Sequence, residues 1–150
     1  MFNIQITGLN EAEQQIRAIA DRASNLNPIA PAVYQAVQED VAQRFASSPG
    51  VRATATVFGG VEWRELSEKY IKSAKREGGT QLKITGDLER QFQKGQAGNV
   101  AESTANSITF GAESGKAKGV DSRRQLLPIH PELVQDVNQI LAGYISSGKL

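Results

Sequence analysis

Hydrophobic and polar residues alternate at the start of the chain, and this alternation predicts a β-strand over residues 2–7. Phe2, Ile4 and Ile6 fall on one side of such a strand, with polar residues between them. A period of two with β-branched residues is typical of a strand that is buried on one face. Elsewhere apolar residues recur three and four positions apart, which is the spacing of one face of a helix.

Three longer helices are predicted from that spacing, near residues 11–24, 29–46 and 132–146. The last has the strongest apolar face, so we expect it to lie in the core and its Leu141 to be buried. The second carries apolar residues at strict four-residue intervals: Val33, Val37, Val41 and Phe45. The first has a small, alanine-rich face that should pack closely against a neighbour: Ala12, Ile16, Ile19, Ala20 and Ala23.

The middle of the chain predicts two short helices and a hairpin. Ser67 is a good N-cap for a helix near 68–77, because its hydroxyl can accept a hydrogen bond from a free N–H of the first turn. A second short helix is predicted near 86–93. Two short strands near 99–103 and 106–111 are joined by residues that favour a turn, and we expect this hairpin to pair with the N-terminal strand.

These elements predict one α+β domain over residues 1–150, with a small antiparallel sheet of about three strands, three longer helices packed against it and two short helices. Such a sheet leaves edges that a neighbouring subunit can cover. Residues 51–60 are small or β-branched and end in Gly-Gly, but no recognised turn ties them to a nearby strand. We therefore favour a flexible or extended arm that orders against a partner, with a plain surface loop as the alternative.

Composition limits the classes of function. The formal net charge of +1 argues against a protein held mainly by nucleic-acid phosphates. There is no cysteine for a disulfide, a thiolate metal site or a thiol nucleophile. The polar start is unlike a signal peptide, and no apolar run is long enough to span a bilayer. One basic loop is a candidate for phosphate contact, with plain solvated charge as the alternative: Lys116, Lys118, Arg123 and Arg124.

No pattern of catalytic residues is evident. The phosphate-binding, dinucleotide-binding, metalloprotease and nucleophile-elbow motifs are all absent. His130, the single histidine, lies between Pro128 and Pro131 and is expected to cap the last helix rather than act as a base or a metal ligand. The sequence therefore predicts no enzyme, no cofactor and no metal. A small DNA-binding accessory protein stays open as an alternative, as does an enzyme without a recognised motif.

Trp63 is the candidate for contact with another subunit. It is the only tryptophan, it follows the predicted arm, and Phe58, Val61 and Leu66 are apolar residues close to it in sequence. Aromatic side chains are enriched where proteins contact one another, so these four residues form the predicted interface. The alternative is that Trp63 belongs to the core of the single chain.

Several short motifs occur in a recognisable order along the chain. They are Trp63, Leu66-Ser67, Lys72 with Lys75, Thr85-Gly86-Asp87-Leu88, Ile108-Thr109-Phe110-Gly111 and the junction from Arg123-Arg124 to Pro128. This order resembles the phage virion morphogenesis family, the Mu-G-like tail-completion and neck proteins of tailed bacteriophages. The chain departs from that family in lacking a Tyr-Ala…His-x-x-Gly segment after the strand, and its junction differs from the usual Arg-Pro-Phe-Leu.

The resemblance implies a structural protein of the virion, assembled in the host cytoplasm. Such a protein forms an oligomeric ring, hexameric in the expected case, at the head–tail junction or at the tail end. The implied partners are further copies of the chain and other phage neck, connector or tail-tube proteins, with non-specific contact to packaged DNA as an option and no membrane. The resemblance leaves open whether the chain is a tail terminator or a head–tail adaptor.

Overall fold

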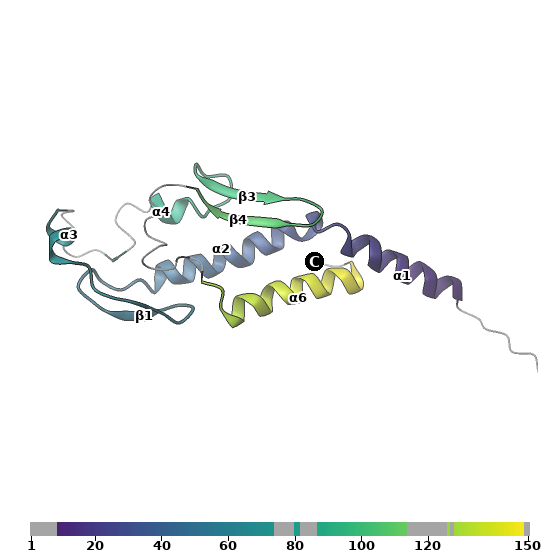
Figure 1. The fold of residues 1–150 in the computed structure, drawn as a ribbon, viewed down its shortest axis with the longest axis horizontal. Helices are drawn as coiled ribbons and strands as arrows, with labels where there is room; N and C mark the ends of the chain where they lie inside the picture. The colour runs from purple at the N-terminus through teal and green to yellow at the C-terminus, as the bar shows by residue number, and fades with distance from the viewer. Residues whose placement is uncertain (1–8, 74–79, 82–86, 114–125, 127, 149–150) are drawn as a thin grey trace, which may run out of the picture.

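The computed structural model describes residues 9–73, 80–81, 87–113, 126 and 128–148. Two long helices, α2 (Ala30–Ala46) and α6 (Pro131–Ser147), lie side by side along the middle of an elongated molecule (Figure 1). α1 (Leu9–Ala23) projects from one end, and α3 (Glu68–Ser73) lies at the other. The other elements are η1 (Asn27–Ile29), β1 (Ala55–Val57), β2 (Val61–Trp63), α4 (Asp87–Arg90), β3 (Asn99–Ser103) and β4 (Ile108–Ala112).

α2 is the helix around which the chain packs, and it confirms the span predicted near 29–46. Val33, Val41 and Phe45 of its predicted stripe are buried and Val37 is half-buried. The first turn contains proline, which lacks the N–H that would be unsatisfied there. Among the described helices, none combines the length and the apolar character that crossing a membrane requires.

α6 packs against the start of α2 in a small apolar cluster. Tyr144 of α6 is buried there against Ile29 and Val33. Leu141, predicted to be buried, is only half-buried, because it lies at the edge of this cluster and packs against its buried members. The helix ends at Gly148, whose φ of +70° is the left-handed conformation that glycine adopts at helix ends.

The strands confirm the α+β class but are arranged differently from the prediction. β3 pairs with β4 in an antiparallel hairpin from Asn99↔Ala112 to Ser103↔Ile108, close to the predicted strands. The strand predicted over 2–7 lies outside the described residues. Within the described chain the strands form two separate two-stranded sheets, β3–β4 and an unpredicted β1–β2.

The prediction of an extended arm over 51–60 is wrong. β1 pairs with β2 in register from Ala55↔Trp63 to Val57↔Val61. The turn between them is made by Gly59 and Gly60, which have φ values of +84° and +78°, so the Gly-Gly end of the segment is the turn that the sequence reasoning missed. Val51 and Val57 are buried, so this part of the chain belongs to the folded body.

The main core lies where the β1–β2 hairpin covers the second half of α2. It contains six buried residues from five segments of the chain: Val41, Phe45, Val57, Trp63, Phe92 and Leu126. α4 is shorter than the helix predicted near 86–93, but Leu88 and Phe92 both reach this core as their four-residue spacing predicts. α3 begins directly after Ser67, and its Ile71 is buried.

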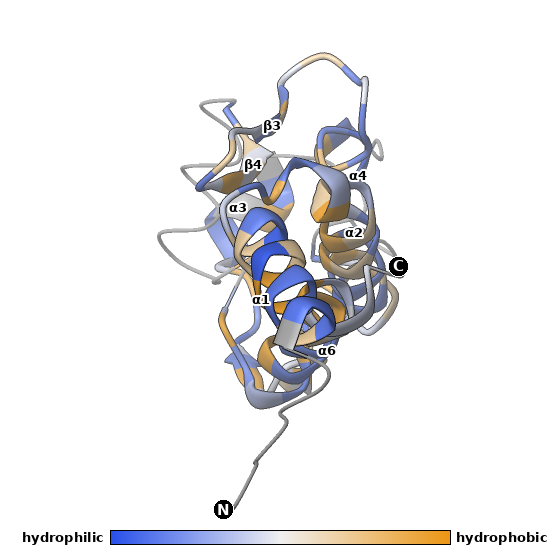
Figure 2. Ribbon diagram, turned by 90° about the vertical axis from the view of Figure 1, so that its right-hand side faces the viewer, coloured by the Kyte–Doolittle hydropathy of each residue, from blue (hydrophilic) through white to orange (hydrophobic). Residues whose placement is uncertain are grey.

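α1 has the predicted span, but its apolar face does not pack as predicted. Ile16 is 67% exposed and Ile19 is 42% exposed, and the alanines of the same face are exposed too. Viewed from its end of the molecule, α1 stands in front of α2 and α6 (Figure 2). Near its C-terminus it is attached to α6, where Arg22 donates a hydrogen bond to the Ile145 carbonyl at 2.8 Å. The face is therefore apolar but has no partner within the described chain.

Candidate functional site

Trp63, the predicted interface anchor, lies in the core of the single chain. Its side chain is 1% exposed and packs with Phe45, Phe92 and the other core residues. The prediction that Trp63 contacts another subunit is therefore corrected, because the folded chain offers almost none of its surface to a partner. An isolated tryptophan between apolar residues is typical of both a core and an interface, and only the position of β2 over α2 separates the two.

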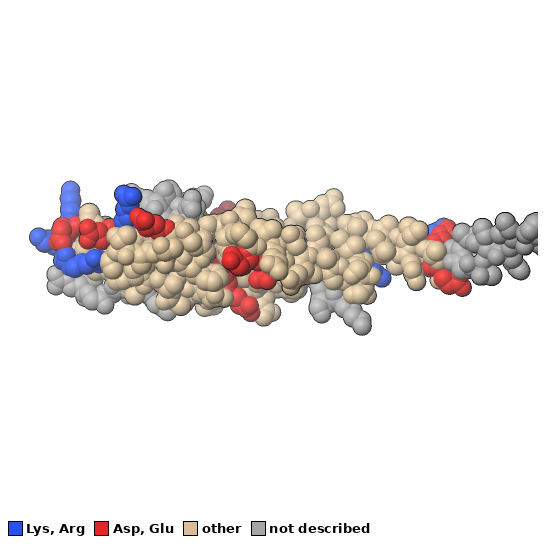
Figure 3. Space-filling model, turned by 90° about the horizontal axis from the view of Figure 1, so that it is seen from below, with Lys and Arg blue, Asp and Glu red and all other residues tan. Residues whose placement is uncertain are grey.

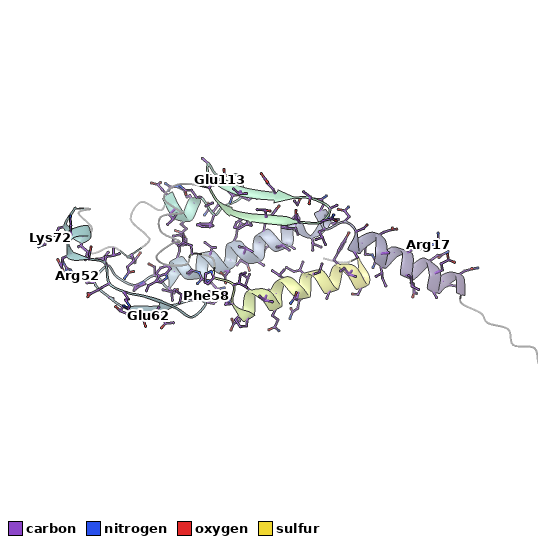
Figure 4. All side chains as sticks on the ribbon, in the orientation of Figure 1. Arg17, Arg52, Phe58, Glu62, Lys72 and Glu113 are labelled. Atoms are coloured by element: carbon purple, nitrogen blue, oxygen red, sulfur yellow. The ribbon has the colours of Figure 1, made fainter. Side chains whose placement is uncertain are left out.

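The other three predicted interface residues are half-buried. Val61 packs against the same core, opposite Val57 across the β1–β2 hairpin. Leu66 donates its N–H to the Val51 carbonyl at 2.9 Å. Phe58 lies in the hairpin turn beside the start of α6 (Figure 4). All three residues are thus parts of the fold of the single chain. The predicted phosphate-contact residues, Lys116, Lys118, Arg123 and Arg124, lie outside the described residues.

A network of four charged side chains, three of them buried, joins α2 to the start of α6. Asp40 and Arg44 lie one helical turn apart on α2, and Arg44 Nη2 donates to Asp40 Oδ2 at 2.9 Å. The second oxygen of Asp40 is hydrogen-bonded to His130 Nε2, and the other ring nitrogen of His130 lies 2.8 Å from Glu132 Oε2. Arg44, Asp40 and His130 are all buried, whereas Glu132 is exposed.

The two carboxylates around His130 favour its protonated form. Ionised carboxylates only accept hydrogen bonds, so both ring nitrogens of His130 must donate. Burial alone lowers the pKa of His130, but the hydrogen bonds to Glu132 and Asp40 outweigh it and raise the pKa above its ordinary value of 6.5. The hydrogen bond from His130 in turn lowers the pKa of Glu132. Two positive and two negative charges therefore balance in this network.

The network also holds the β1–β2 hairpin. Arg44 donates to the Phe58 carbonyl, and the Phe58 ring stands edge-on to the His130 ring at a centroid distance of 5.4 Å. Ser47 Oγ accepts from the Phe58 N–H at 2.9 Å. A side chain at Gly59 would place its Cβ 2.7 Å from the Arg44 guanidinium nitrogens, so Arg44 would have to shift to accommodate it. These contacts connect the β1–β2 hairpin, α2 and α6, and we call the group Asp40, Arg44, His130 and Glu132 the latch.

His130 corrects the sequence-based assignment in one respect. It occupies the N-cap position of α6, and its backbone carbonyl accepts the Val134 N–H at 3.1 Å, but its side chain makes no capping hydrogen bond. A usable signal was present in the sequence, since Asp40 and Arg44 lie beside Val41 and Phe45 on the apolar half of α2. Within the part of the chain described, no three ligating side chains converge to hold a metal ion.

Acidic and basic side chains are unevenly distributed over the surface. On the face in Figure 3, Lys and Arg gather at the α3 end, whereas the middle carries Asp and Glu. α6 contributes Glu132 and Asp136 and has no basic residue in its sequence. At the α3 end the basic charge is partly neutralised, because Arg52 pairs with Glu68 and Arg64 pairs with Glu62 at 3.3 Å.

A cleft of about 480 Å³ lies between α2 and the segment around α4. Val41, Ala42 and Phe92 form its apolar part. Glu39 and Glu89 also line it, one from each side. The cleft and the exposed face of α1 are both partly apolar surface features of the described chain.

Comparisons with known protein families, with curated proteins and with solved structures find no match to this chain.

Proposed function

We propose that this chain is a structural protein of a tailed-phage virion that assembles into an oligomeric ring at the head–tail junction or at the tail end. The observation that carries the proposal is the exposed apolar face of α1. The motif order of the sequence, which resembles the virion morphogenesis proteins, supplies the biological setting. The proposal includes residence in the virion, contact with other neck, connector or tail-tube proteins, and no catalytic activity.

The exposed face favours association for an energetic reason. Burying one isoleucine side chain fully contributes about 1.5–3 kcal/mol. On α1, Ile16 leaves 67% of its surface in water and Ile19 leaves 42%, so part of this free energy is available to a contact. Within the described residues, the apolar face of α1 gains little from burial against its own chain. Packing of this face against further copies would recover that free energy at every contact around a ring.

The direction of α1 is fixed before any partner binds. Arg22 is hydrogen-bonded to α6, and the N–H of Leu26, between α1 and η1, donates to the Ala105 carbonyl at 2.8 Å. Less conformational freedom is lost on binding when the contacting element is already ordered. This preorganisation supports α1 as a rigid contact element rather than a loose tail.

The mass of the purified protein tests the proposal. Light scattering and electron microscopy of the wild-type chain should show a closed multimer, and Ile16→Asp should give a monomer with unchanged circular dichroism. Gln14→Asp is the matched control, because Gln14 is exposed on the opposite side of the same helix and its substitution should leave the multimer intact. If the wild-type chain stays monomeric at every concentration, the proposal is contradicted. The same holds if Gln14→Asp abolishes the multimer as completely as Ile16→Asp does.

A DNA-binding role is the competing function. Lys69 and Lys72 are exposed on α3, at the end of the molecule where Figure 3 shows basic side chains. Binding through such charges weakens steeply as salt increases, because each phosphate contact releases counterions. A duplex that binds the chain with that salt dependence, while light scattering shows only monomer, would favour this alternative.

A further inference from the structure

The exposed face of α1 and the α2–α4 cleft lie on different parts of an elongated molecule. α1 projects beyond one end of α6 (Figure 1). On α2 the cleft is lined by residues within 35–42, in the middle of the helix. The hydrogen bonds of Arg22 and Leu26 hold α1 away from its own cleft. Among the described residues, none occupies the cleft or covers the apolar face of α1, and each surface is offered to another molecule.

The two features match in their apolar parts. The face of α1 presents Ile16 and Ile19 between alanines, so it is narrow and can approach another helix closely. The cleft presents Ala42 as an exposed small residue on α2, with Val41 and Phe92 below it. A helix with small residues on its contact face is suited to such a shallow apolar cleft.

The charges beside these apolar parts match as well. Arg17 is 75% exposed and follows Ile16 directly, whereas the cleft is lined by the carboxylates of Glu39 and Glu89. Lys94 lines the same cleft, and Glu13 lies one turn before Arg17 on α1. Arg17 pairs with Glu13 in the single chain, but an exposed pair of this kind contributes only about 0–1 kcal/mol and is readily exchanged for pairs with a partner.

We infer that α1 of one copy packs its apolar face into the α2–α4 cleft of the next copy, with Arg17 facing Glu39 and Glu89. This inference rests on the proposed self-assembly and names the two surfaces that make the contact. Because the two surfaces differ, the contact is head-to-tail, and its repetition gives a ring when the rotation between copies closes. Each copy then uses its α1 once and its cleft once.

Engineered cysteines test this contact directly, because the chain has no cysteine of its own. Ile16→Cys and Ala42→Cys are combined in one chain, which is treated with a short bismaleimide crosslinker and run on a denaturing gel. The double variant should give a ladder of covalent multimers, and a mixture of the two single variants should give a covalent dimer. Each single variant alone should stay monomeric on the gel. Gln14→Cys with Ala42→Cys is the matched control and should give no ladder.

The outcomes separate the failure of this inference from the failure of the proposed function. A covalent dimer from Ile16→Cys alone means that α1 pairs with α1, and it overturns the inference. A multimer seen by light scattering without any ladder also overturns it, while leaving the ring intact. A wild-type chain that is monomeric by light scattering removes both the ring and this contact.

Charge reversal provides a second and independent test. Arg17→Glu should weaken association about tenfold, the scale of a close charge pair across an interface. Adding Glu39→Lys and Glu89→Lys to the same chain should restore the wild-type multimer. If the triple variant associates no better than Arg17→Glu alone, Arg17 does not face these carboxylates and the inference fails.

Discussion

Removing the charge of Asp40 should destabilise the folded chain strongly. The carboxylate of Asp40 is hydrogen-bonded to both buried cations, through Oδ2 to Arg44 and through Oδ1 to His130. Asp40→Asn keeps the size of the side chain and removes its negative charge. Arg44 would then lie buried without an ionised partner among the contacts described here.

The magnitude follows from the burial of the network. Breaking a buried ion pair by removing one partner costs about 3–5 kcal/mol, because the remaining charge is left uncompensated. Domains of this size lose about 2–4 °C of melting temperature for each kcal/mol, so Asp40→Asn should melt about 6–20 °C below the wild type. Such a loss is a large part of a typical unfolding free energy of about 5–15 kcal/mol.

Thermal and urea unfolding, followed by circular dichroism at neutral pH, measure this loss. Glu39→Gln is the matched control, because Glu39 is the adjacent carboxylate on α2 and is exposed; it should change the unfolding free energy by less than about 0.5 kcal/mol. The reasoning is refuted if Asp40→Asn and Glu39→Gln melt together. Asp40→Asn combined with Arg44→Met should cost less than the sum of the two single changes, since both charges of that pair are then absent.

Three further changes test the core, the hairpin turn and the titration of the latch. Trp63→Ala should lower the unfolding free energy of the monomer by about 3–5 kcal/mol, because Trp63 is buried in the core. A variant with wild-type stability would contradict this position of Trp63. Gly59→Ala should cost about 1–3 kcal/mol more than Gly60→Ala, because both have positive φ but only a Cβ at Gly59 meets Arg44; equal losses would contradict the close approach. Because the folded-state pKa of His130 is raised, its contribution to stability is fully present below the unfolded value of 6.5 and is lost as pH rises through the higher folded value. Urea unfolding of the wild type and of His130→Gln between pH 5 and about 9 checks this, and parallel curves would show that His130 does not titrate in the latch.

Local patterns in the sequence determined much of the secondary structure. The spacing of apolar residues predicts the spans of α1, α2 and α6, because helix periodicity is a property of the local chain. The strands of the β3–β4 hairpin, and the α+β class, follow from local signals in the same way. The β1–β2 hairpin was missed because its turn depends on positive φ at Gly59 and Gly60, and Gly-Gly is equally typical of a flexible end.

Which apolar residues have a partner was decided only by the tertiary structure. Trp63 and Ile16 both belong to apolar patterns in the sequence, yet one is buried and the other is exposed. His130 meets Asp40 across 90 positions of the chain, and no local spacing encodes such a contact. The physical reason is that a periodic pattern shows that a surface is apolar, whereas burial depends on which distant element is placed against it. For the apolar face of α1, no described element of the same chain is placed against Ile16, so this side chain stays exposed.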